Sequence, residues 1–470
     1  MAVISIATKV TLGPVSKDGH GSGTEEFMTN TLTTTGSTTR STKDLMRVAV
    51  SGWLGTAMEY MDFQLYSLAS ALIFGKIFFP NLNPAVGLMA AFLGYAVGFM
   101  ARPLGAWFFG RMGDRLGRKK VLVLTIGLMG VSTMLIGFLP TYAQIGIWAP
   151  IMLFSLRIAQ GFGAGAELSG ASVMLAEYAP APRRGLVASF VCLGTTSGTL
   201  LATGIWVLLT RMPDNALYTW GWRIPFILSI AISIYSLWIR RNLKESPVFE
   251  TTRDAALEVK NGTAKLPRAR FGKSFLIAVC LRIGESGNSA MIQTFLVGYV
   301  VSAMSMDKGV GTLALLIGSF IGIATTPLAG WLSDKIGRRA MYRGLSAFQF
   351  AFAIPAMLML TSGNQLLVSL ALIIGLSVSV VGMFSVQSAY LNELFGARNR
   401  YTQLALAKEI GGVLSGGLAP LIAAALLVAF AHAWWPFAAM MMFYAGIALV
   451  ATFFAPETKG RDLTLMADAV

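Results

Sequence analysis

The loop GRMGDRLGRK occupies residues 110–119, and a second version of it, GWLSDKIGRR, occupies residues 330–339. Both copies follow the pattern G-x-x-x-D-[RK]-x-G-R-[RK], and each joins two long apolar segments. A short charged loop that recurs at the same place between apolar segments, roughly 220 residues apart, indicates an internal duplication. The chain is therefore expected to contain two related halves.

The composition is that of a membrane protein. Of the 470 residues, 55% are hydrophobic and only 13% are charged, and the mean hydropathy is +0.65. A soluble domain carries charge on about a quarter of its residues. Apolar runs recur from about residue 47 to about residue 455, and a β-barrel would show short alternating strands instead. These runs predict transmembrane helices.

The net charge of +15 could suggest a nucleic-acid partner, but its distribution argues against one. Loops near 80–85, 140–145 and 361–365 carry no Lys or Arg. The basic residues gather in the alternate loops, at 111–120, 183–184, 240–273, 335–343 and 398–400. This alternation follows the positive-inside rule, so the basic loops and both termini are expected in the cytoplasm.

Twelve spans divide into two pseudo-symmetric six-helix lobes, the expected fold of an all-α integral membrane protein. The spans are 46–77, 86–110, 119–140, 145–177, 184–210, 221–241, 273–303, 309–334, 340–361, 365–394, 400–430 and 433–456. The predicted parts are a disordered cytoplasmic leader (1–42), an N-terminal lobe (43–241), a cytoplasmic linker (242–272), a C-terminal lobe (273–456) and a cytoplasmic tail (457–470). Parallel repeats of this kind build transporters whose site lies between the lobes.

Cysteine and histidine offer little chemistry. Cys192 and Cys280 lie in apolar segments and are expected in the core, so neither a disulfide nor a metal site is predicted. His20 and His432 lie outside the spans, which argues against a histidine proton relay. The leader lacks a sustained apolar stretch, so no cleavable signal peptide is predicted.

Each copy of the loop is expected to meet an acid at the end of a later span and form a cytoplasmic cluster that gates transport. The gating residues are Asp114, Arg115, Arg118 and Glu177 in the first half, and Asp334, Lys335, Arg338 and Glu393 in the second. Alternatively, the basic residues only fix topology and cap helix ends. Recurrence of the acids with the bases in both halves favours gating.

The first two spans carry ionisable residues, which inside a membrane are functional candidates by default. Glu59 and Asp62 are three residues apart on one helix face, and neighbouring carboxylates do not both ionise easily, which suits a proton-coupling site. A structural acid paired with an arginine is the alternative. Arg102 either binds substrate or neutralises Asp62 or Glu59. Tyr60 and Tyr66 either line the cavity or pack against lipid and neighbouring helices.

Further candidates lie in later spans. The fourth span contributes Arg157, Gln160 and Glu167, the seventh Arg282, Glu285, Asn288 and Gln293, and the tenth Gln387. Arg157 could bind substrate or form a structural bridge. Arg282 and Glu285 are close enough to neutralise each other. Lys408 and Glu409 are weaker candidates that could snorkel at a cytoplasmic end.

These motifs together resemble the metabolite:proton symporter family of the major facilitator superfamily. The matching stretches are EYMDFQLY (59–66), RIAQG (157–161) followed by Glu167, WRIPF (222–226), ESPVF (245–249) and PETKG (456–460). The resemblance implies a major facilitator fold and proton-driven transport of organic acids such as α-ketoglutarate, citrate or shikimate, or of the zwitterions proline and betaine. The chain departs from the family at Tyr60-Met61, where Trp-Tyr is common, so no relative's substrate is carried over.

The sequence thus predicts a proton symporter that imports a small organic acid (a mono-, di- or tricarboxylate, or a shikimate-like acid) across the bacterial inner membrane by alternating access. Arg102, Arg157 and Arg282 would attract the carboxylate; Glu59 and Asp62 would carry the proton, with Glu167 and Glu285 in reserve. The expected partners are substrate, proton and membrane lipid, with no cofactor and a monomer as the functional unit. The alternatives are a zwitterion or osmolyte carrier and, more remotely, a non-transporting sensor. Since no nucleophile–base pair or metal cluster appears, an enzyme is not expected.

Overall fold

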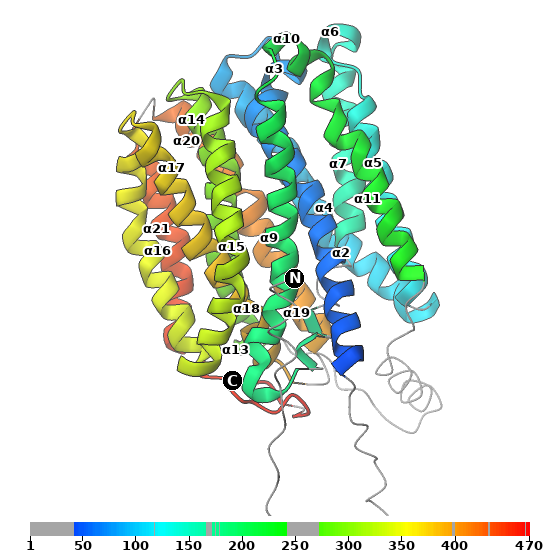
Figure 1. Cartoon of the computed structure of the whole chain (residues 1–470), viewed down its shortest axis with the longest axis vertical. Coiled ribbons are helices and arrows are strands. Elements are labelled where there is room, and N and C mark those ends of the chain that lie inside the picture. Colours follow the sequence, from blue (N-terminus) through cyan, green and yellow to red (C-terminus); the bar gives the residue numbers. More distant parts are fainter. Residues whose placement is uncertain are drawn as a thin grey trace, which may run out of the picture. The chain divides into compact units, whose positions relative to one another are not determined.

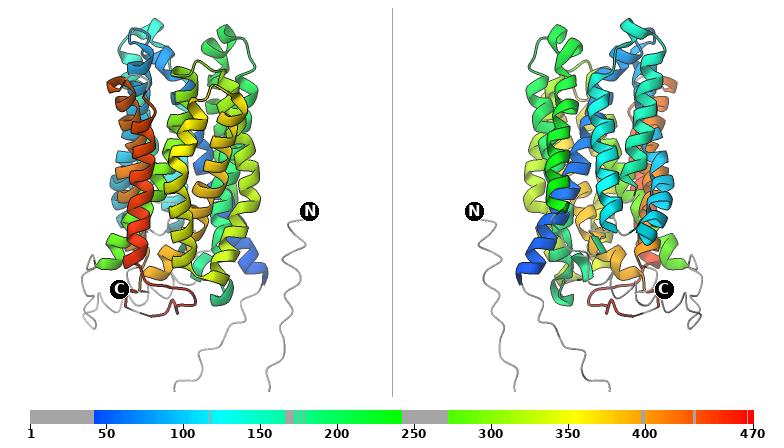
Figure 2. Two further views of the ribbon diagram at one scale, coloured as in Figure 1. Left: turned by 90° about the vertical axis from the view of Figure 1, so that its left-hand side faces the viewer. Right: turned by 90° about the vertical axis from the view of Figure 1, so that its right-hand side faces the viewer.

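A computed structural model describes residues 42–116, 118–165, 172–173, 175–177, 179–241, 272–396, 400–430, 433–465 and 467–470. Every regular element in these ranges is a helix, and the long helices run side by side in both views of Figure 2. The predicted leader and most of the predicted linker lie outside the described residues, as do Glu167 and His432. The side chains of Asp114, Arg115 and Arg118 also lie outside the description.

The first half contains long helices joined by short connections (Figure 1). They are α2 (Thr42–Ala69), continued by a π-helical turn (Ser70–Phe74) and α3 (Gly75–Phe78); α4 (Pro84–Leu116); α5 (Arg118–Phe138); α6 (Tyr142–Ile145); α7 (Trp148–Ala164); a 3₁₀ turn (Ala181–Arg183); α9 (Arg184–Leu209); α10 (Asp214–Ala216) with a π turn (Leu217–Gly221); and α11 (Arg223–Arg241).

The second half repeats this organisation with three spans interrupted by π turns. Its helices are α13 (Lys273–Ala290), a π turn (Met291–Phe295) and α14 (Leu296–Ser302); α15 (Lys308–Ile336); α16 (Arg338–Thr361); α17 (Gln365–Ile374), a π turn (Gly375–Val380) and α18 (Val381–Leu394); α19 (Arg400–Gly411), a π turn (Gly412–Gly417) and α20 (Ala419–Ala429); and α21 (Trp435–Phe454).

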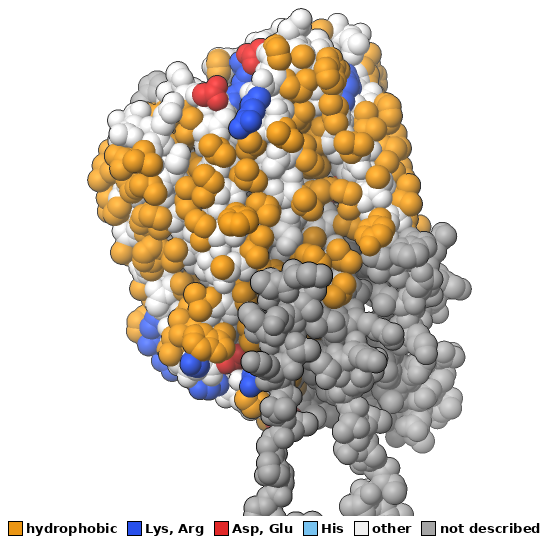
Figure 3. All heavy atoms as spheres, in the orientation of Figure 1, with side chains coloured by type: hydrophobic (Ala, Val, Ile, Leu, Met, Phe, Trp, Pro, Cys, Tyr) orange, Lys and Arg blue, Asp and Glu red, His pale blue; other side chains and the backbone are white. Residues whose placement is uncertain are grey.

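The helices follow the predicted spans closely. Among the described residues, eight helices are long and apolar enough to cross a membrane, or nine if the bent pair Asp214–Gly221 and Arg223–Tyr235 forms one span. The predicted spans 46–77, 119–140 and 145–177 are occupied by α2–α3, α5 and α7. Hydrophobic side chains cover the middle of the face in Figure 3, and Lys and Arg lie toward its two ends. The fold is therefore that of an all-α, multi-pass membrane protein.

The two halves meet along several helix pairs. Helix α9 packs against α15 and α18, and α4 packs against α20 and the turn before it, while α2 lies along α9 within the first half. Glycines allow the closest approach, because a Cβ at Gly330 in α15 would lie only 2.6 Å from the carbonyl oxygen of Gly185 in α9. Small residues let membrane helices touch backbone to backbone, so this contact fixes how the halves meet.

Candidate functional site

Arg102 joins the two halves inside the membrane-spanning region. From α4, its Nη2 lies 2.7 Å from Oε1 of Glu59 in α2, and its Nε lies 3.1 Å from Oε2 of Glu409 in α19. All three side chains are buried. The guanidinium also lies 4.8 Å from the ring centre of Phe63, a distance typical of a cation–π contact. We call Glu59, Arg102 and Glu409 the bridging triad.

The bridging triad changes the interpretation of Glu409 and shows which acid Arg102 contacts. Glu409 does not snorkel toward a membrane surface, because its side chain is buried against an arginine of the other half. Lys408 is likewise buried rather than snorkelling. Of the two acids considered for Arg102, Glu59 is the one that it contacts.

Asp62 belongs to a separate network inside the first half. Its Oδ2 accepts a hydrogen bond of 3.0 Å from Thr133 in α5, and Gln160 in α7 donates to the same hydroxyl at 2.7 Å. Arg157 donates to Gln160 in turn. Glu59 and Asp62 thus share a helix face but have different partners. Thr133 was missed from the sequence, since a lone threonine in an apolar span has no distinguishing pattern.

Arg157 is fully buried, with its guanidinium 3.8 Å from the ring centre of Tyr66. Its Nε and Nη2 have no hydrogen-bond acceptor in the part of the chain that the structure describes. The aromatic face compensates part of the charge, and a buried arginine without full satisfaction is energetically costly. The Tyr66 ring therefore packs against the Arg157 guanidinium within the first half.

The second half has its own buried pair. Arg282 in α13 donates to Glu285 one turn later, as the spacing suggested, and approaches Oε1 of Gln387 in α18 at 3.4 Å. The amide of Gln387 donates to the hydroxyl of Tyr342 at 3.0 Å. Gln387 therefore orients Arg282 from the opposite side of the lobe.

A small polar cavity of about 30 Å³ lies between the halves. The predicted residues Tyr60, Glu285 and Gln293 line it. It is also lined by hydroxyl and thiol groups that were not predicted as site residues, namely Cys192, Thr195, Thr196, Thr199, Ser289 and Ser319. The run Thr195-Thr196-Ser197-Gly198-Thr199 was the available signal, a cluster of hydroxyls in an otherwise apolar span. A cavity of this size is too small for an organic acid, so the halves lie close together around it.

Asn288 and Gln293 serve different purposes from each other. Asn288 donates to the carbonyl oxygen of Met441 in α21 at 3.2 Å, so it packs α13 against α21 and is absent from the cavity lining. Gln293 lines the cavity, and its side chain donates to Ser289 at 2.7 Å. Its backbone carbonyl oxygen accepts a hydrogen bond of 3.3 Å from the side chain of Gln64 of the first half.

At the end of the bundle that holds the basic loops, here called the basic end, acids and arginines pair across the halves. Arg184 of the first half lies 3.0 Å from Glu393 of the second. Arg400 of the second half lies 3.0 Å from Glu177 of the first. We call these two contacts the crossed pairs. Burial lowers the pKa of the Arg400 guanidinium, and the Glu177 charge opposes that shift.

Asp334 and Arg338 complete the basic end. Asp334 accepts hydrogen bonds of 2.8 Å from the backbone amides of Gly185 and Leu186, where the positive end of the α9 dipole favours a carboxylate. Arg338 contacts Asp334 at 2.8 Å and Glu393 at 3.1 Å. Of the two basic residues predicted for this cluster, Arg338 at the start of α16 contacts both acids, whereas the amine of Lys335 lies over the Trp331 ring.

The segment after α21 fastens the same end. Thr458 donates to Glu393 at 2.8 Å, and Arg461 donates to the carbonyl oxygen of Glu393 at 2.7 Å. Glu457 accepts from the backbone amides of Arg338 and Arg339, at 2.8 and 3.0 Å, at the start of α16. The motif PETKG thus has a structural purpose in this chain, which sequence reasoning did not assign.

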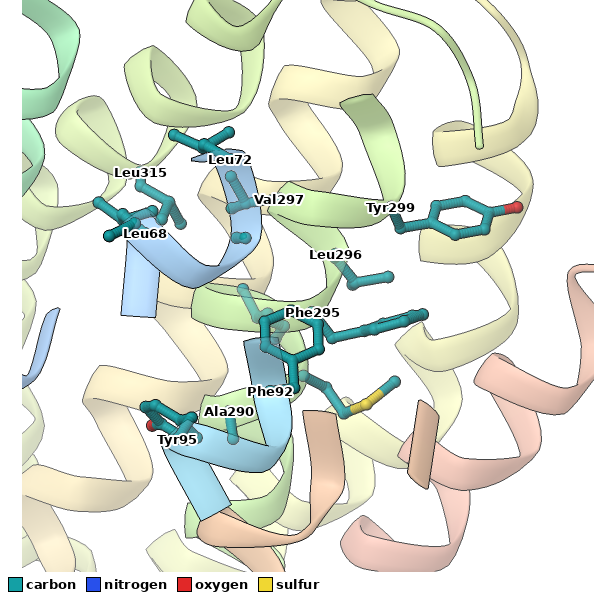
Figure 4. Packing of buried hydrophobic residues seen from close by; sticks show 14 of the residues in the cluster. Leu68, Leu72, Phe92, Tyr95, Ala290, Phe295, Leu296, Val297, Tyr299 and Leu315 are labelled. Atoms are coloured by element: carbon teal, nitrogen blue, oxygen red, sulfur yellow. The ribbon is translucent and has the colours of Figure 1, made fainter. Parts of the chain in front are cut away.

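At the opposite end of the bundle, apolar side chains close the halves against each other (Figure 4). Leu68, Leu72 and Phe92 of the first half lie in one buried cluster with Phe295 and Val297 of the second. The Phe92 and Phe295 ring centres are 6.5 Å apart. Two polar contacts accompany them: Ser67 with Thr294 at 2.6 Å, and Lys308 with the exposed Asp214 at 2.6 Å. Both ends are therefore closed.

The chain resembles known transporters over most of its length. The family described as Major Facilitator Superfamily matches residues 52–420. YdfJ of Escherichia coli (strain K12), whose name proposes a transporter without naming a substrate, is 47% identical over 415 residues, which are 87% of this chain and 96% of that protein. The shikimate transporter of the same organism is 36% identical, over 83% of this chain and 89% of that protein. The proline/betaine transporter of Salmonella typhimurium is 35% identical, over 89% of this chain and 85% of that protein.

Solved structures agree on the fold. The proton:xylose symporter XylE bound to 6-bromo-6-deoxy-D-glucose superimposes with a TM-score of 0.71 at 19% identity, over 90% of this chain and 98% of that one. The family match spans most of the sequence, and each of these three relatives aligns with more than four fifths of it. The chain belongs to the major facilitator superfamily and is a membrane transporter rather than an enzyme.

Proposed function

We propose that this protein imports a small organic acid together with a proton across the bacterial inner membrane, by alternating access and as a monomer. The observation that carries the proposal is the bridging triad, because a buried arginine held by one carboxylate from each half couples protonation to the contact between halves. The basic end would face the cytoplasm. The proton is the only coupling partner required, with no cofactor.

The triad suggests how coupling works. With both carboxylates ionised, Arg102 holds α2 and α19 together. Protonation of Glu59 or Glu409 removes one charge, weakens the contact between halves and leaves a positive charge that attracts a substrate carboxylate. Asp62 would fulfil the same purpose within the first half, where Thr133, Gln160 and Arg157 respond to its charge. Each exchange replaces one buried ion pair by another, which avoids an isolated charge in the membrane.

Substrate would bind in the cavity between the halves. Tyr60, Gln293 and the hydroxyls of α9 offer hydrogen bonds there, with Arg282 and Gln387 behind Glu285. Asn288 and Tyr66 are better explained by helix packing and by the Arg157 contact, so they are removed from the proposed binding set. The charges of the basic end would act as the gate that must part when the cavity opens to that side.

The alternative substrate class is a zwitterion such as proline or betaine. It is favoured by the relatives named proline/betaine transporters, which are 34–35% identical to this chain over 89% of its length. A cavity lined by hydroxyls and by Glu285, which is paired with Arg282, can hold either ligand. Organic acids and zwitterions differ in net charge, so the experiment must include compounds of both classes.

The test is uptake into proteoliposomes of radiolabelled shikimate, α-ketoglutarate, citrate, proline and glycine betaine, with and without an inward proton gradient. We expect accumulation of at least one acid that a protonophore abolishes. Arg102→Ala should lower uptake at least tenfold, because it leaves two buried carboxylates facing each other. Arg211→Gln, on an exposed loop residue, is the matched control. Uptake that ignores the protonophore would refute symport, and uptake of glycine betaine alone would establish the alternative.

A further inference from the structure

Lys408 is a buried charged residue that belongs neither to the bridging triad nor to the other ion pairs described above. It lies in α19 directly before Glu409, and only 4% of the residue is exposed. Within the described ranges, its amine makes no hydrogen bond and no ion pair. A lysine in a membrane span costs several kcal/mol unless it is paired or wetted, so a buried lysine without a contact partner points to a missing ligand.

The surroundings of Lys408 connect it to the cavity. The groups close enough to interact electrostatically with its amine are Arg282, Cys192, Glu409 and Glu285. Of these, Cys192 and Glu285 line the cavity between the halves. Two neighbouring residues of α19 therefore have different surroundings: Glu409 contacts Arg102, and Lys408 lies within electrostatic range of two residues of the cavity lining.

The charges around the cavity limit what can bind there. The bridging triad, the Arg282–Glu285 pair and Lys408 together contain three cations and three carboxylates. Each carboxylate contacts an arginine, so Lys408 is the cation of this group that lacks a contacting anion. One added proton would leave one excess positive charge, which a ligand with a single negative charge balances. A zwitterion would leave that excess in place, and a dianion would reverse it.

We propose that Lys408 anchors the carboxylate of a monoanionic substrate, and that the transported acid is therefore a monocarboxylate. This rests on the proposed function and specifies its substrate class. The amine donates to the carboxylate from α19 while the hydroxyls of α9 and α15 hold the rest of the molecule in the cavity. The contact also links substrate binding to Glu409, since Lys408 and Glu409 share one turn of helix.

The first test measures proton-driven uptake of shikimate, a monocarboxylate, by Lys408→Gln, Lys408→Arg and the control Lys76→Gln. We expect Lys408→Gln to raise KM for shikimate at least about tenfold, the consequence of removing one partner from a buried charged contact. Lys408→Arg should stay within a few-fold of wild type, and Lys76, which is exposed near the opposite end, should have no effect. A structural role alone would lower the amount of folded protein without shifting KM.

The second test uses the unmodified protein, so it does not depend on a variant that folds. Amines are methylated with formaldehyde and cyanoborohydride, and the extent at each lysine is read by mass spectrometry. Saturating shikimate should protect Lys408 several-fold and leave Lys76 unchanged, whereas shikimate methyl ester should protect neither.

The outcomes separate this inference from the proposed function. If the wild-type protein takes up none of the five compounds with protons, the proposed function fails. If proton-driven shikimate uptake occurs but KM in Lys408→Gln and the methylation of Lys408 are both unchanged, the lysine anchor is wrong and symport stands. Proton-driven uptake of only citrate, α-ketoglutarate or glycine betaine would overturn the monocarboxylate assignment.

Discussion

The basic end and the opposite end of this bundle are both closed, but by different chemistry. At the basic end, charged residues of the two halves contact each other. The crossed pairs join arginines to acids, and Asp334 accepts a hydrogen bond from the backbone of the first half. At the opposite end, leucines, valines and phenylalanines pack against each other. The strength of an ion pair depends on its geometry, its partner and the ionic strength, whereas the strength of apolar packing depends on the area removed from water. The two barriers to alternating access should therefore respond to different perturbations.

The largest expected effect comes from Glu393→Gln, which removes the charge that Arg184 and Arg338 share. Arg184 loses its acid and Arg338 keeps only Asp334, which should cost the closed basic end about 3–5 kcal/mol. The measurement is thiol labelling of Ala188→Cys, at the buried contact of α9 with α18, in a background with Cys192 and Cys280 replaced by serine. We expect much faster labelling and nearly complete loss of uptake. Unchanged labelling would show that the basic end is closed by something other than these charges.

Phe295→Ala should weaken the apolar closure at the opposite end of the bundle. Phe295 is fully buried between Phe92 and Phe437, so truncation removes apolar contacts worth about 3 kcal/mol or more. Labelling of Ala71→Cys, which faces Gly298 across the halves, should rise and should not respond to salt. Phe443→Ala, on an exposed ring, is the control. A strong salt dependence in Phe295→Ala would contradict an apolar closure.

A smaller effect is expected at the other crossed pair. Glu177 is partly exposed, so Glu177→Gln should destabilise the closed basic end by only about 1–2 kcal/mol. Labelling of Ala188→Cys should rise modestly, and high salt should bring the parent protein partway toward the variant. The exchange Glu177→Arg with Arg400→Glu should recover part of the loss. If the double variant is no better than the sum of the single ones, the pair contributes no specific coupling.

The smallest effect should come from Lys308→Gln at the opposite end. Its partner Asp214 is largely exposed, and surface ion pairs contribute at most about 1 kcal/mol. Labelling of both reporter cysteines and uptake should stay near the parent values. A large change in Ala71→Cys labelling would mean that the opposite end also depends on charge, and the contrast between the two ends would disappear.

The comparison also explains which features could be predicted from sequence. The helices α4, α9 and α15 appear where apolar length and basic loops indicated, because the bilayer imposes both. The ionisable residues Glu59, Arg102, Arg282 and Glu285 could be identified one by one, since charge in an apolar span stands out. Arg282 with Glu285 could even be paired, because one helical turn separates them.

Partners from distant helices could not be assigned in this way. Glu409 was considered a weaker candidate that could snorkel, yet it contacts Arg102, and of the predicted cluster residues Lys335 and Arg338 only Arg338 contacts the acids. The hydroxyl of Thr133 left no distinctive signal, and the run that contains Thr199 did not by itself indicate a cavity, because Ser and Thr in helices commonly bond to their own backbone. Their cavity and network positions emerge only when α5, α9 and the second half are placed together.

By itself the sequence determined that this protein is a duplicated, helical membrane transporter, because hydropathy, loop charge and repeated motifs act locally or through the bilayer. The tertiary structure decided the crossed pairs, the bridging triad and the isolation of Lys408 from any contacting anion among the described residues. These depend on which helix faces meet across the halves. A buried charge is stabilised only by the partner that packing brings within a few ångströms of it, and that choice is made in three dimensions.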